Sequence, residues 1–347
     1  MGERVRVQRI LAIDAGGTST RAAVVDASGL CLGYGIAGGG NPVSDGYDQA
    51  VTAVADAAEK AVAESRAARH TISPTLVAMA GAGPRMQPTP IAERLVALGL
   101  DGDVHIEADL LAMFHSGTHQ SSGCVLVAGT GSVAARITAG RLDLVSDGAG
   151  WLLGDTGSGY WIGHRVARAV VASLDGRGPG TALSALLLSE LHLEETPERM
   201  HGRPRVMLDL IDALYKLRPV GLSRFAPLAF KACGQDPVAS RIVTDAASAL
   251  AGTLNAVRDH RLQGPVVIGG SVARAALAAP PAVAAPLRAA LGSEEVIPVE
   301  DGLIGAAVLG LRRAGIRVDQ EVFRRLQQTV GPLREAAGPG TKTQPTT

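Results

Sequence analysis

Cysteine and aromatic residues are scarce in this chain of 347 residues, and their scarcity excludes several kinds of protein. The three cysteines, Cys31, Cys124 and Cys233, are isolated in the sequence and form no CxxC pair. An odd, scattered set supports neither a disulfide framework nor a structural zinc site, so we expect a protein of the reducing cytoplasm. Phe, Trp and Tyr make up only 3% of the chain, so the core must be built mainly from aliphatic side chains.

Charge of one sign and long hydrophobic runs are lacking as well. The 33 Lys and Arg residues balance the 33 Asp and Glu residues, so no overall field attracts nucleic acid or an anionic membrane. No apolar run reaches the roughly 18 residues of a membrane span, and the charged start, MGERVRVQRI, has no signal-peptide pattern. We therefore expect neither a nucleic-acid nor a membrane partner, and any anion must be bound locally.

Hydrophobic residues and glycine are abundant. Hydrophobic residues make up 46% of the chain and there are 43 glycines, which is typical of a soluble α/β protein with many sharp turns. The length exceeds the size of roughly 250 to 300 residues at which single cores stop growing. We therefore expect two domains or lobes.

Two similar segments lie more than a hundred residues apart. LAIDAGGTSTRAAVV, residues 11–25, places a Gly-Thr-Ser turn between two apolar runs, which on its own is typical of an ordinary β-hairpin. VLVAGTGSVAARITAG, residues 125–140, repeats this order and indicates an internal duplication. Glycine lets backbone amides approach a ligand closely, and Thr and Ser hydroxyls donate to oxygen, so both turns suit phosphate.

The elements around each hairpin follow one order. For the first copy we predict three antiparallel strands, an amphipathic helix with Val51, Val54, Ala58 and Val62 on one face, and then alternating strands and helices. The predicted positions are strands 8–14, 20–26 and 30–36, helix 46–69, strand 75–83, a helix from about 91, strand 103–108 and a helix from 110. This order is βββαβαβα.

A second copy begins at about residue 123. Its predicted elements are strands 124–129, 132–138 and 141–146, a helix from about 158, strands 265–270 and 295–300, and a helix from 301. We predict an N-terminal lobe over 1–118, a C-terminal lobe over 119–315 with a helical insertion over about 175–262, a C-terminal helix over 316–331 and a disordered tail over 332–347.

The order of these motifs resembles the actin-like ATPase superfamily, which includes many sugar kinases. AIDAGGTSTRAAVVD is similar to its first phosphate motif, VAGTGSVAA to its second and VVIGGSVAR to its adenosine motif. GAGWLLGDTGSGYWIG, residues 148–163, is similar to the N-acetylglucosamine kinase branch, which includes BadF-type ATPases. The resemblance covers about residues 8–315. It implies an α/β fold of two ribonuclease H-like lobes, each with a mixed sheet, with ATP in the cleft between them.

The resemblance implies a set of nucleotide contacts. The two hairpins would bind the phosphates and a strand–helix turn would bind adenosine, through Gly16, Gly17, Thr18, Ser19, Gly129, Thr130, Gly131, Ser132, Gly269 and Gly270. On spacing alone the last two glycines fit a plain βα turn equally well. Many relatives have Lys where this chain has Ser19, so amides, hydroxyls and metal must supply more of the phosphate binding here.

Two aspartates have both a structural and a catalytic interpretation. Asp14 ends the first strand and could cap a turn. Beside a phosphate-binding hairpin, however, a carboxylate is poorly placed unless a cation lies between it and the phosphates, so we expect Asp14 to hold Mg²⁺ through water. Asp109 could cap the helix that follows it. The resemblance implies instead a general base that accepts the proton of the attacking sugar hydroxyl. Relatives usually have Asn before this Asp, where this chain has Ala108.

The resemblance also implies a sugar site. Asn41 precedes Pro42 and could be a turn residue, although an amide also suits a polyol. The expected sugar-binding residues are Asn41, Asp109, Gly148, Gly150 and Asp155. Relatives often have Glu where this chain has Thr156, which could change the pocket near the C2 substituent of the sugar.

The expected activity is transfer of the γ-phosphate of ATP to the 6-hydroxyl of N-acetylglucosamine, with ATP and Mg²⁺ as cofactors and a homodimer as the assembly common among relatives. Glucosamine is the alternative acceptor. A BadF-type ATPase that activates a radical dehydratase is a further alternative, but it needs cysteine ligands for an iron–sulfur cluster. A sensor without catalysis would have lost Asp109 or a hairpin, and this chain retains them.

Overall fold

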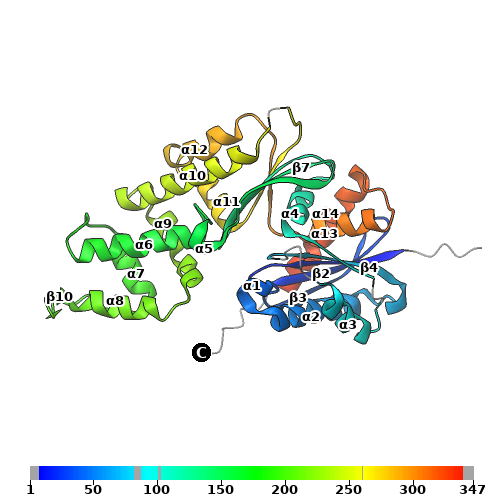
Figure 1. Cartoon of the computed structure of the whole chain (residues 1–347), viewed down its shortest axis with the longest axis horizontal. Helices are drawn as coiled ribbons and strands as arrows, with labels where there is room; N and C mark the ends of the chain where they lie inside the picture. The colour runs from blue at the N-terminus through cyan, green and yellow to red at the C-terminus, as the bar shows by residue number, and fades with distance from the viewer. Residues whose placement is uncertain (1–7, 82–86, 101–102, 260, 339–347) are drawn as a thin grey trace, which may run out of the picture. The chain divides into compact units, whose positions relative to one another are not determined.

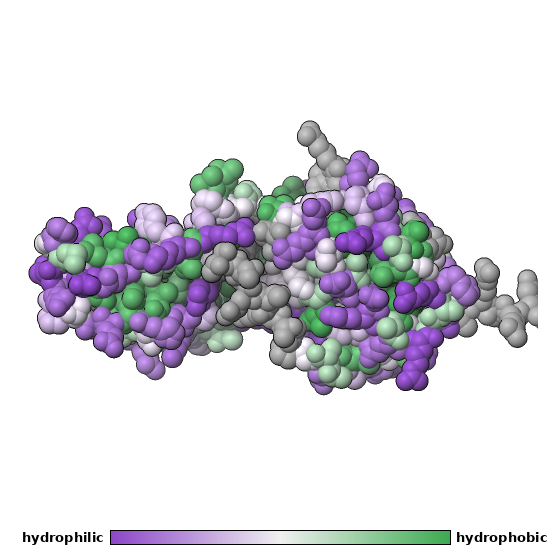
Figure 2. Space-filling view, turned by 90° about the horizontal axis from the view of Figure 1, so that it is seen from below, coloured by the Kyte–Doolittle hydropathy of each residue, from purple (hydrophilic) through white to green (hydrophobic). Residues whose placement is uncertain are grey.

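The computed structural model describes residues 8–81, 87–100, 103–259 and 261–338, which fold into two compact units (Figure 1). Unit 1 is formed by residues 1–121, 139–141 and 301–347, and unit 2 by residues 122–138 and 142–300. Each unit is built around its own five-stranded sheet. The face shown in Figure 2 intermixes hydrophilic and hydrophobic side chains rather than gathering the hydrophobic ones into one band.

The sheet of unit 1 has the strand order β3-β2-β1-β4-β5. Its first three strands form the predicted antiparallel meander, β4 pairs parallel to β1, and β5 pairs parallel to β4. The strands are β1 (Arg9–Ala15), β2 (Thr20–Asp26), β3 (Cys31–Ala37), β4 (Ile72–Met79) and β5 (Val104–Ala108). Because β1, β4 and β5 run in the same direction, their carboxyl ends meet at one edge of the sheet.

Helices cover both faces of this sheet, because successive side chains of a strand point to opposite sides. Leu11 and Ile13 pack beneath α2 and α3, whereas Ile10 and Ala12 pack beneath α13 and α14. The predicted apolar face of the first long helix is confirmed in α2. The helical elements of unit 1 are α1 (Pro42–Asp45), α2 (Tyr47–Ser65), η1 (Arg69–Thr71), α3 (Thr89–Ala97), α4 (Asp109–Gly117), α13 (Leu303–Arg313) and α14 (Gln320–Ala337).

Unit 2 repeats the plan of unit 1. Its sheet has the order β12-β11-β6-β7-β8, in which a meander of three strands is again extended by two parallel strands. The strands are β6 (Gly123–Ala128), β7 (Ser132–Thr138), β8 (Arg141–Asp147), β11 (Val266–Gly269) and β12 (Val296–Val299). In both units the first strand is central, with the second and third strands on one side of it and the fourth and fifth on the other. This shared order confirms the predicted duplication.

The helical insertion predicted over about 175–262 is too wide. Within it, α10 (Pro237–Val257) packs against β6 and β7 and buries Val243 and Leu250 in the core of the unit, so it is a sheet-covering helix. Long apolar helices look alike in sequence whether they cover a sheet or one another. The other elements of unit 2 are α5 (Gly150–Leu153), α6 (Gly159–Leu174), α7 (Leu183–Glu190), β9 (Arg199–Met200), β10 (Arg203–Pro204), α8 (Arg205–Tyr215), η2 (Pro219–Phe225), α9 (Ala226–Ala232), α11 (Ser271–Ala278) and α12 (Pro281–Leu291).

The C-terminal segment also differs from the prediction. Residues 301–313 were assigned to the second lobe, but α13 packs against α4, β1 and β4 of unit 1. The predicted tail begins too early, because α14 continues through Pro332 to Ala337. Burial of Phe323, Leu326 and Val330 against unit 1 outweighs the helix-breaking tendency of that proline. Residues 339–347 of the predicted tail lie outside the described residues.

No helix among the residues that the structure describes is long and apolar enough to cross a membrane.

The contact between α4 and α13 depends on Gly305. A Cβ at this position would clash with the backbone carbonyl of Ala112, which lies in the middle of α4. The amide of Gly305 also donates a hydrogen bond to Ser116 Oγ at 2.9 Å. The two helices can therefore lie this close only because residue 305 has no side chain.

We predict that Gly305→Ala lowers the free energy of unfolding by about 1 to 3 kcal/mol, the usual effect of overpacking. Gly252→Ala is the matched control, because this exposed position inside α10 has open space around it. The control should gain about 0.5 to 1 kcal/mol from helix propensity. Urea unfolding of both variants measures the difference, and a neutral Gly305→Ala would contradict the close contact.

Candidate active site

The first predicted phosphate turn is held open by backbone hydrogen bonds. The amide of Gly16 donates to the carbonyl of Ser19 at 3.1 Å, and the amide of Gly40 donates to the carbonyl of Gly16 at 2.9 Å. Gly17 and Thr18 lie exposed at the tip. The tip therefore presents backbone and a hydroxyl to solvent beside the carboxyl end of β1.

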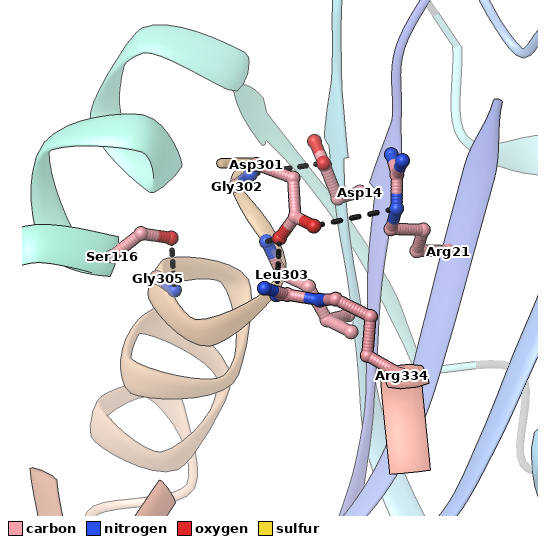
Figure 3. Close-up of polar contacts among 8 residues, drawn as sticks. All are labelled: Asp14, Arg21, Ser116, Asp301, Gly302, Leu303, Gly305 and Arg334. Atoms are coloured by element: carbon pink, nitrogen blue, oxygen red, sulfur yellow. Dashed lines mark hydrogen bonds and ion pairs between the residues drawn. The ribbon is translucent and has the colours of Figure 1, made fainter. Parts of the chain in front are cut away.

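Asp14 lies at the same edge and is 7% exposed. Its Oδ2 accepts a hydrogen bond at 2.9 Å from the amide of Gly302, which precedes α13 (Figure 3). A Cβ on Gly302 would lie 2.8 Å from Asp14 Oδ1, so glycine is needed for this approach. The hydrogen bond joins two residues that are 288 positions apart in the sequence.

A second aspartate supports this contact. Asp301 pairs with Arg21 Nε at 3.3 Å and with Arg334 Nη2 at 2.9 Å, and its Oδ1 also accepts from the amide of Leu303 (Figure 3). Arg21 lies directly opposite Asp14 in the register of β1 and β2. Strand β2, α14 and the start of α13 are thereby joined around the buried Asp14.

The environment of Asp14 disfavours a negative charge. The pKa of this carboxyl is raised to about 7, mainly by burial and secondly by the charge of Asp301. The Gly302 amide and Arg21 act in the opposite direction, while Asp109 adds a smaller upward shift to the Asp14 pKa. Burial is the largest of these effects, so the carboxylate form needs a nearby cation.

This chemistry fits Mg²⁺ held mainly by phosphate oxygens and water. Magnesium commonly uses only one or two protein carboxylates and keeps several waters. In the ranges covered by the structure, no group of three or more His, Cys, Asp or Glu side chains could enclose a metal ion. Asp14 could therefore assist a phosphate-bound metal, and these residues could not build a cage of their own.

Asp109 is the first residue of α4 and follows the carboxyl end of β5. Its Oδ1 accepts from the amide of Leu110 at 2.9 Å. The N-cap position itself belongs to Ala108, which has no capping side chain. Burial raises the pKa of the Asp109 carboxyl. The structure thus places Asp109 at the same edge of the sheet as Asp14, and a raised pKa suits a group that must accept a proton.

Asn41 caps a short helix that the sequence analysis did not predict. Its Oδ1 accepts from the amide of Val43 at 2.9 Å, at the start of α1. A Cβ on Gly81, which follows β4, would lie 2.6 Å from this oxygen. Asn41 therefore has the capping role expected of a turn residue, and it lies beside the ends of β1 and β4 where the sugar-binding interpretation also requires it.

The second predicted phosphate turn lies in unit 2 and is tied to the start of α6. The amide of Gly129 donates to Gly131 O at 2.9 Å, the amide of Gly159 donates to Gly129 O at 2.7 Å, and the amide of Tyr160 donates to Thr130 O at 3.1 Å. Thr130 is exposed at the tip. The rigid start of a long helix thus fixes the position of this turn.

Ser132 and Asp155 link the second turn to the loop between α5 and α6. Ser132 Oγ donates to the carbonyl of Thr156 at 2.9 Å, and the Ser132 amide donates to Asp155 Oδ1 at 3.0 Å. Burial raises the pKa of the half-buried Asp155, and the charge of Asp147 also raises it. The Ser132 hydroxyl, expected on phosphate, and one oxygen of Asp155, expected on sugar, are thus engaged within the unit.

Asp147 is a residue that the sequence analysis missed. It ends β8, and its two oxygens accept from the amides of Asp155 at 2.7 Å and Thr156 at 2.9 Å. It orders the loop that carries the predicted sugar-binding residues. The available signal was an acid directly before the Gly-Ala-Gly turn, where Gly148 and Gly150 have φ of +73° and +79°.

The predicted adenosine turn follows β11. Gly270 has φ of +88°, and a Cβ there would clash with the carbonyl of Ala128 at the end of β6. Packing alone therefore explains why residue 270 is glycine, whether or not a ligand binds there. The turn nevertheless lies at the carboxyl edge of the unit 2 sheet, as the second phosphate turn does, because β6 and β11 are parallel.

The duplicated strand order and the glycine turns at the sheet edges define the actin-like fold shared by sugar kinases and related ATPases. The chain belongs to the BadF/BadG/BcrA/BcrD ATPase family, whose model matches residues 11–310.

Similar proteins include two with related names. The N-acetyl-D-glucosamine kinase of Dictyostelium discoideum is 29% identical over 260 residues, which cover 71% of this chain and 78% of that protein. The N-acetylmuramic acid/N-acetylglucosamine kinase of Clostridium acetobutylicum is 32% identical over 119 residues, which cover 34% of this chain and 39% of that protein.

Solved structures with the same fold include a provisionally named N-acetylglucosamine kinase of Porphyromonas gingivalis. It has a TM-score of 0.67 and 20% identity, and the match covers 88% of this chain and 100% of that one. A protein of the same provisional name from Chromobacterium violaceum has a TM-score of 0.66 and 21% identity, with 88% and 99% covered.

The helix that carries Asp109 is held in place by a neutral histidine. His115 Nδ1 lies 3.3 Å from the carbonyl of Thr118, and Arg312 Nη1 on α13 lies 3.2 Å from His115 Nε2. Since arginine can only donate, Nε2 accepts and Nδ1 carries the proton. Burial lowers the pKa of His115 to about 4, and the charge of Arg312 contributes to the lowering.

Because the folded-state pKa of His115 lies below the ordinary value, the unfolded chain binds more protons between about pH 6.5 and 4. Stability that is present above pH 6.5 is therefore lost as the pH falls through this range. We predict that His115→Gln reduces the loss by up to about 3 kcal/mol. Urea unfolding at pH 7 and 4.5 measures it, with the exposed His70→Gln as control. Equal pH dependence in both variants would contradict the assignment.

Proposed function

We propose that the protein is an ATP-dependent kinase that phosphorylates the 6-hydroxyl of N-acetylglucosamine. The observation that carries the proposal is the placement of two carboxylates, the buried Asp14 and the half-buried Asp109, at the sheet edge where the first glycine turn lies. Asp109 also raises the pKa of Asp14, so the two groups are close enough to interact. The names of the relatives from Dictyostelium and Clostridium support an amino sugar as acceptor.

The phosphates of ATP would bind to the exposed tips of the glycine turns. Gly16, Gly17, Thr18 and Ser19 would do so in unit 1, and Gly129, Thr130 and Gly131 in unit 2, where the amide and hydroxyl of Ser132 are engaged by Asp155 and Thr156. Exposed amides and hydroxyls of this kind suit phosphate oxygens. Gly269 and Gly270 would lie against adenosine, since a turn without side chains lets a ring approach the backbone.

Mg²⁺ bound to the phosphates would neutralise their charge, and Asp14 would hold its water shell. The buried carboxyl of Asp14 fits this role because its charged form is disfavoured without a cation. Arg21 and Arg334 pair with Asp301 and so restrain its carboxylate beside Asp14.

Asp109 would act as the general base. It accepts the proton of the sugar 6-hydroxyl as the sugar oxygen forms a bond to the γ-phosphorus and the bond to the bridging oxygen of ADP breaks in line. Its raised pKa brings it closer to that of a useful base at neutral pH. Asn41, Gly148, Gly150 and Asp155 would orient the sugar hydroxyls.

Glucosamine is the alternative acceptor, and a dehydratase-activating ATPase is the alternative reaction. An iron–sulfur cluster needs several cysteine thiolates gathered as ligands, and no group of three or more His, Cys, Asp or Glu side chains is gathered among the described residues. Cys31 and Cys124 are buried, and burial raises the pKa of each thiol to about 11, while Cys233 is half-buried. These environments favour the kinase. We further propose a cytoplasmic homodimer, which the unpaired cysteines and the exposed Leu152 and Leu153 of α5 support.

We predict that Asp109→Asn lowers kcat about 10²- to 10⁴-fold while sugar affinity changes little, because Asn keeps the shape but cannot take the proton. Asp319→Asn is the matched control. Asp319 also accepts backbone amides at a helix start of unit 1, at 3.0 Å and 3.1 Å, and Asn caps as well as Asp. A coupled assay and calorimetric sugar titration separate the two. Near-normal turnover in Asp109→Asn would contradict the role of Asp109 as the general base.

We predict that Thr130→Val raises the KM for ATP or lowers kcat/KM about 10- to 100-fold, through loss of one hydroxyl donor to a charged oxygen worth about 1.5 to 3 kcal/mol. Sugar binding should change much less. Thr138→Val at the opposite end of β7 is the control and should behave as the parent protein. Unchanged ATP kinetics in Thr130→Val would remove the second turn from the nucleotide site.

A further inference from the structure

A cavity of about 670 Å³ opens between α6 and α10 of unit 2. This volume lies in the range of small-molecule sites. Three arginines line it, two from α6 and one from α10, together with a floor of small and apolar side chains. The arginines are Arg165, Arg168 and Arg241, and the floor is formed by Ala169, Pro179, Pro237, Val238 and Ile242.

The cavity carries an excess of positive charge. Asp245 is the one acid that lines it, and this carboxylate lies 3.0 Å from Arg241 and 3.8 Å from Arg165. Within the described ranges, Arg168 has no acidic partner at ion-pair distance. His164 also lines the cavity, and its pKa is lowered first by burial and then by the charges of Arg168 and Arg165. One carboxylate therefore faces three guanidinium groups.

Aromatic contacts fix one wall of the cavity. The guanidinium of Arg165 lies 3.8 Å from the ring centre of Trp161, a cation–π contact. His164 stacks on Tyr160 with ring centres 5.8 Å apart. Such contacts reduce the freedom of the side chains before a ligand binds, which lowers the entropic cost of binding.

The cavity lies on the opposite face of α6 from the candidate nucleotide turn. Gly159 packs on the carbonyl of Gly129, and a Cβ on Gly163 would clash with the carbonyl of Leu222 in η2. At about 100° per residue, Trp161 and Arg165 point away from these two glycines. The arginine cavity is therefore separate from the residues proposed to bind ATP.

We propose that this cavity binds a small organic phosphate. Arg168 and Arg241 hold its phosphate group, because the planar guanidinium matches phosphate oxygens in a bidentate way. The organic part packs on Val238, Ile242 and the neighbouring prolines. The proposal does not depend on the proposed kinase activity. A sugar phosphate and a nucleotide share the required chemistry, and the experiment distinguishes them.

Fluorescence of Trp161 reports on this cavity directly. The chain has two tryptophans, so Trp151→Phe leaves Trp161 as the only tryptophan, which is excited selectively over the tyrosines at about 295 nm. This variant is titrated at constant ionic strength with glucose 6-phosphate, with AMP and with inorganic phosphate. We expect a saturable change in emission, with tighter binding of one organic phosphate than of inorganic phosphate. The tighter of the two organic probes identifies the class.

Variants in the same background test the arginines. Arg168→Ala and Arg241→Ala should each weaken binding about 10-fold or more, the usual loss for a charge-assisted hydrogen bond. Arg261→Ala is the matched control, since this exposed arginine follows the far end of α10 and does not line the cavity. No saturable change with any probe, inorganic phosphate binding as tightly as both organic probes, or an equal loss in Arg261→Ala, would overturn the proposal.

Discussion

The buried hydrogen bond between Asp14 and Gly302 is the constraint on which the candidate site depends. It fixes the last residues of β1 against the start of α13, although the two segments are 288 positions apart. Gly302 and Gly305 lack side chains at the points where α13 approaches Asp14 and α4. Asp301 pairs with Arg21 of β2 and Arg334 of α14, which also fixes the residues directly before α13.

One consequence is that an unfavourable carboxylate environment is built into the fold. Burial outweighs the Gly302 amide and Arg21, so the Asp14 pKa is raised to about 7. A cation next to this group would lower the pKa again, and the metal–phosphate complex of the proposed reaction would supply one. In unit 2, Asp155 accepts a hydrogen bond from the Ser132 amide of the second turn, and Asp147 accepts one from the amide of Asp155.

The sequence predicted the parts of the fold that are set by local patterns. The apolar strand runs, the glycine turns, the apolar face of α2 and the duplicated order were all readable, and Asp14 and Asp109 lie together at one sheet edge as the strand directions require. The short helices α1 and α5 were missed because four residues carry no periodicity. The roles of Asp301, Arg334 and α10 depend on tertiary contacts across long stretches of chain, which local patterns do not encode.

Product analysis tests the central claim most directly. The wild-type protein is incubated with ATP and Mg²⁺, with and without N-acetylglucosamine or glucosamine, and the ADP and the phosphorylated sugar are quantified by phosphorus NMR. The kinase account predicts ADP formation that depends on the sugar, with one N-acetylglucosamine 6-phosphate formed for each ADP. ADP release at the same rate without sugar, and no phosphorylated sugar with either acceptor, would contradict it.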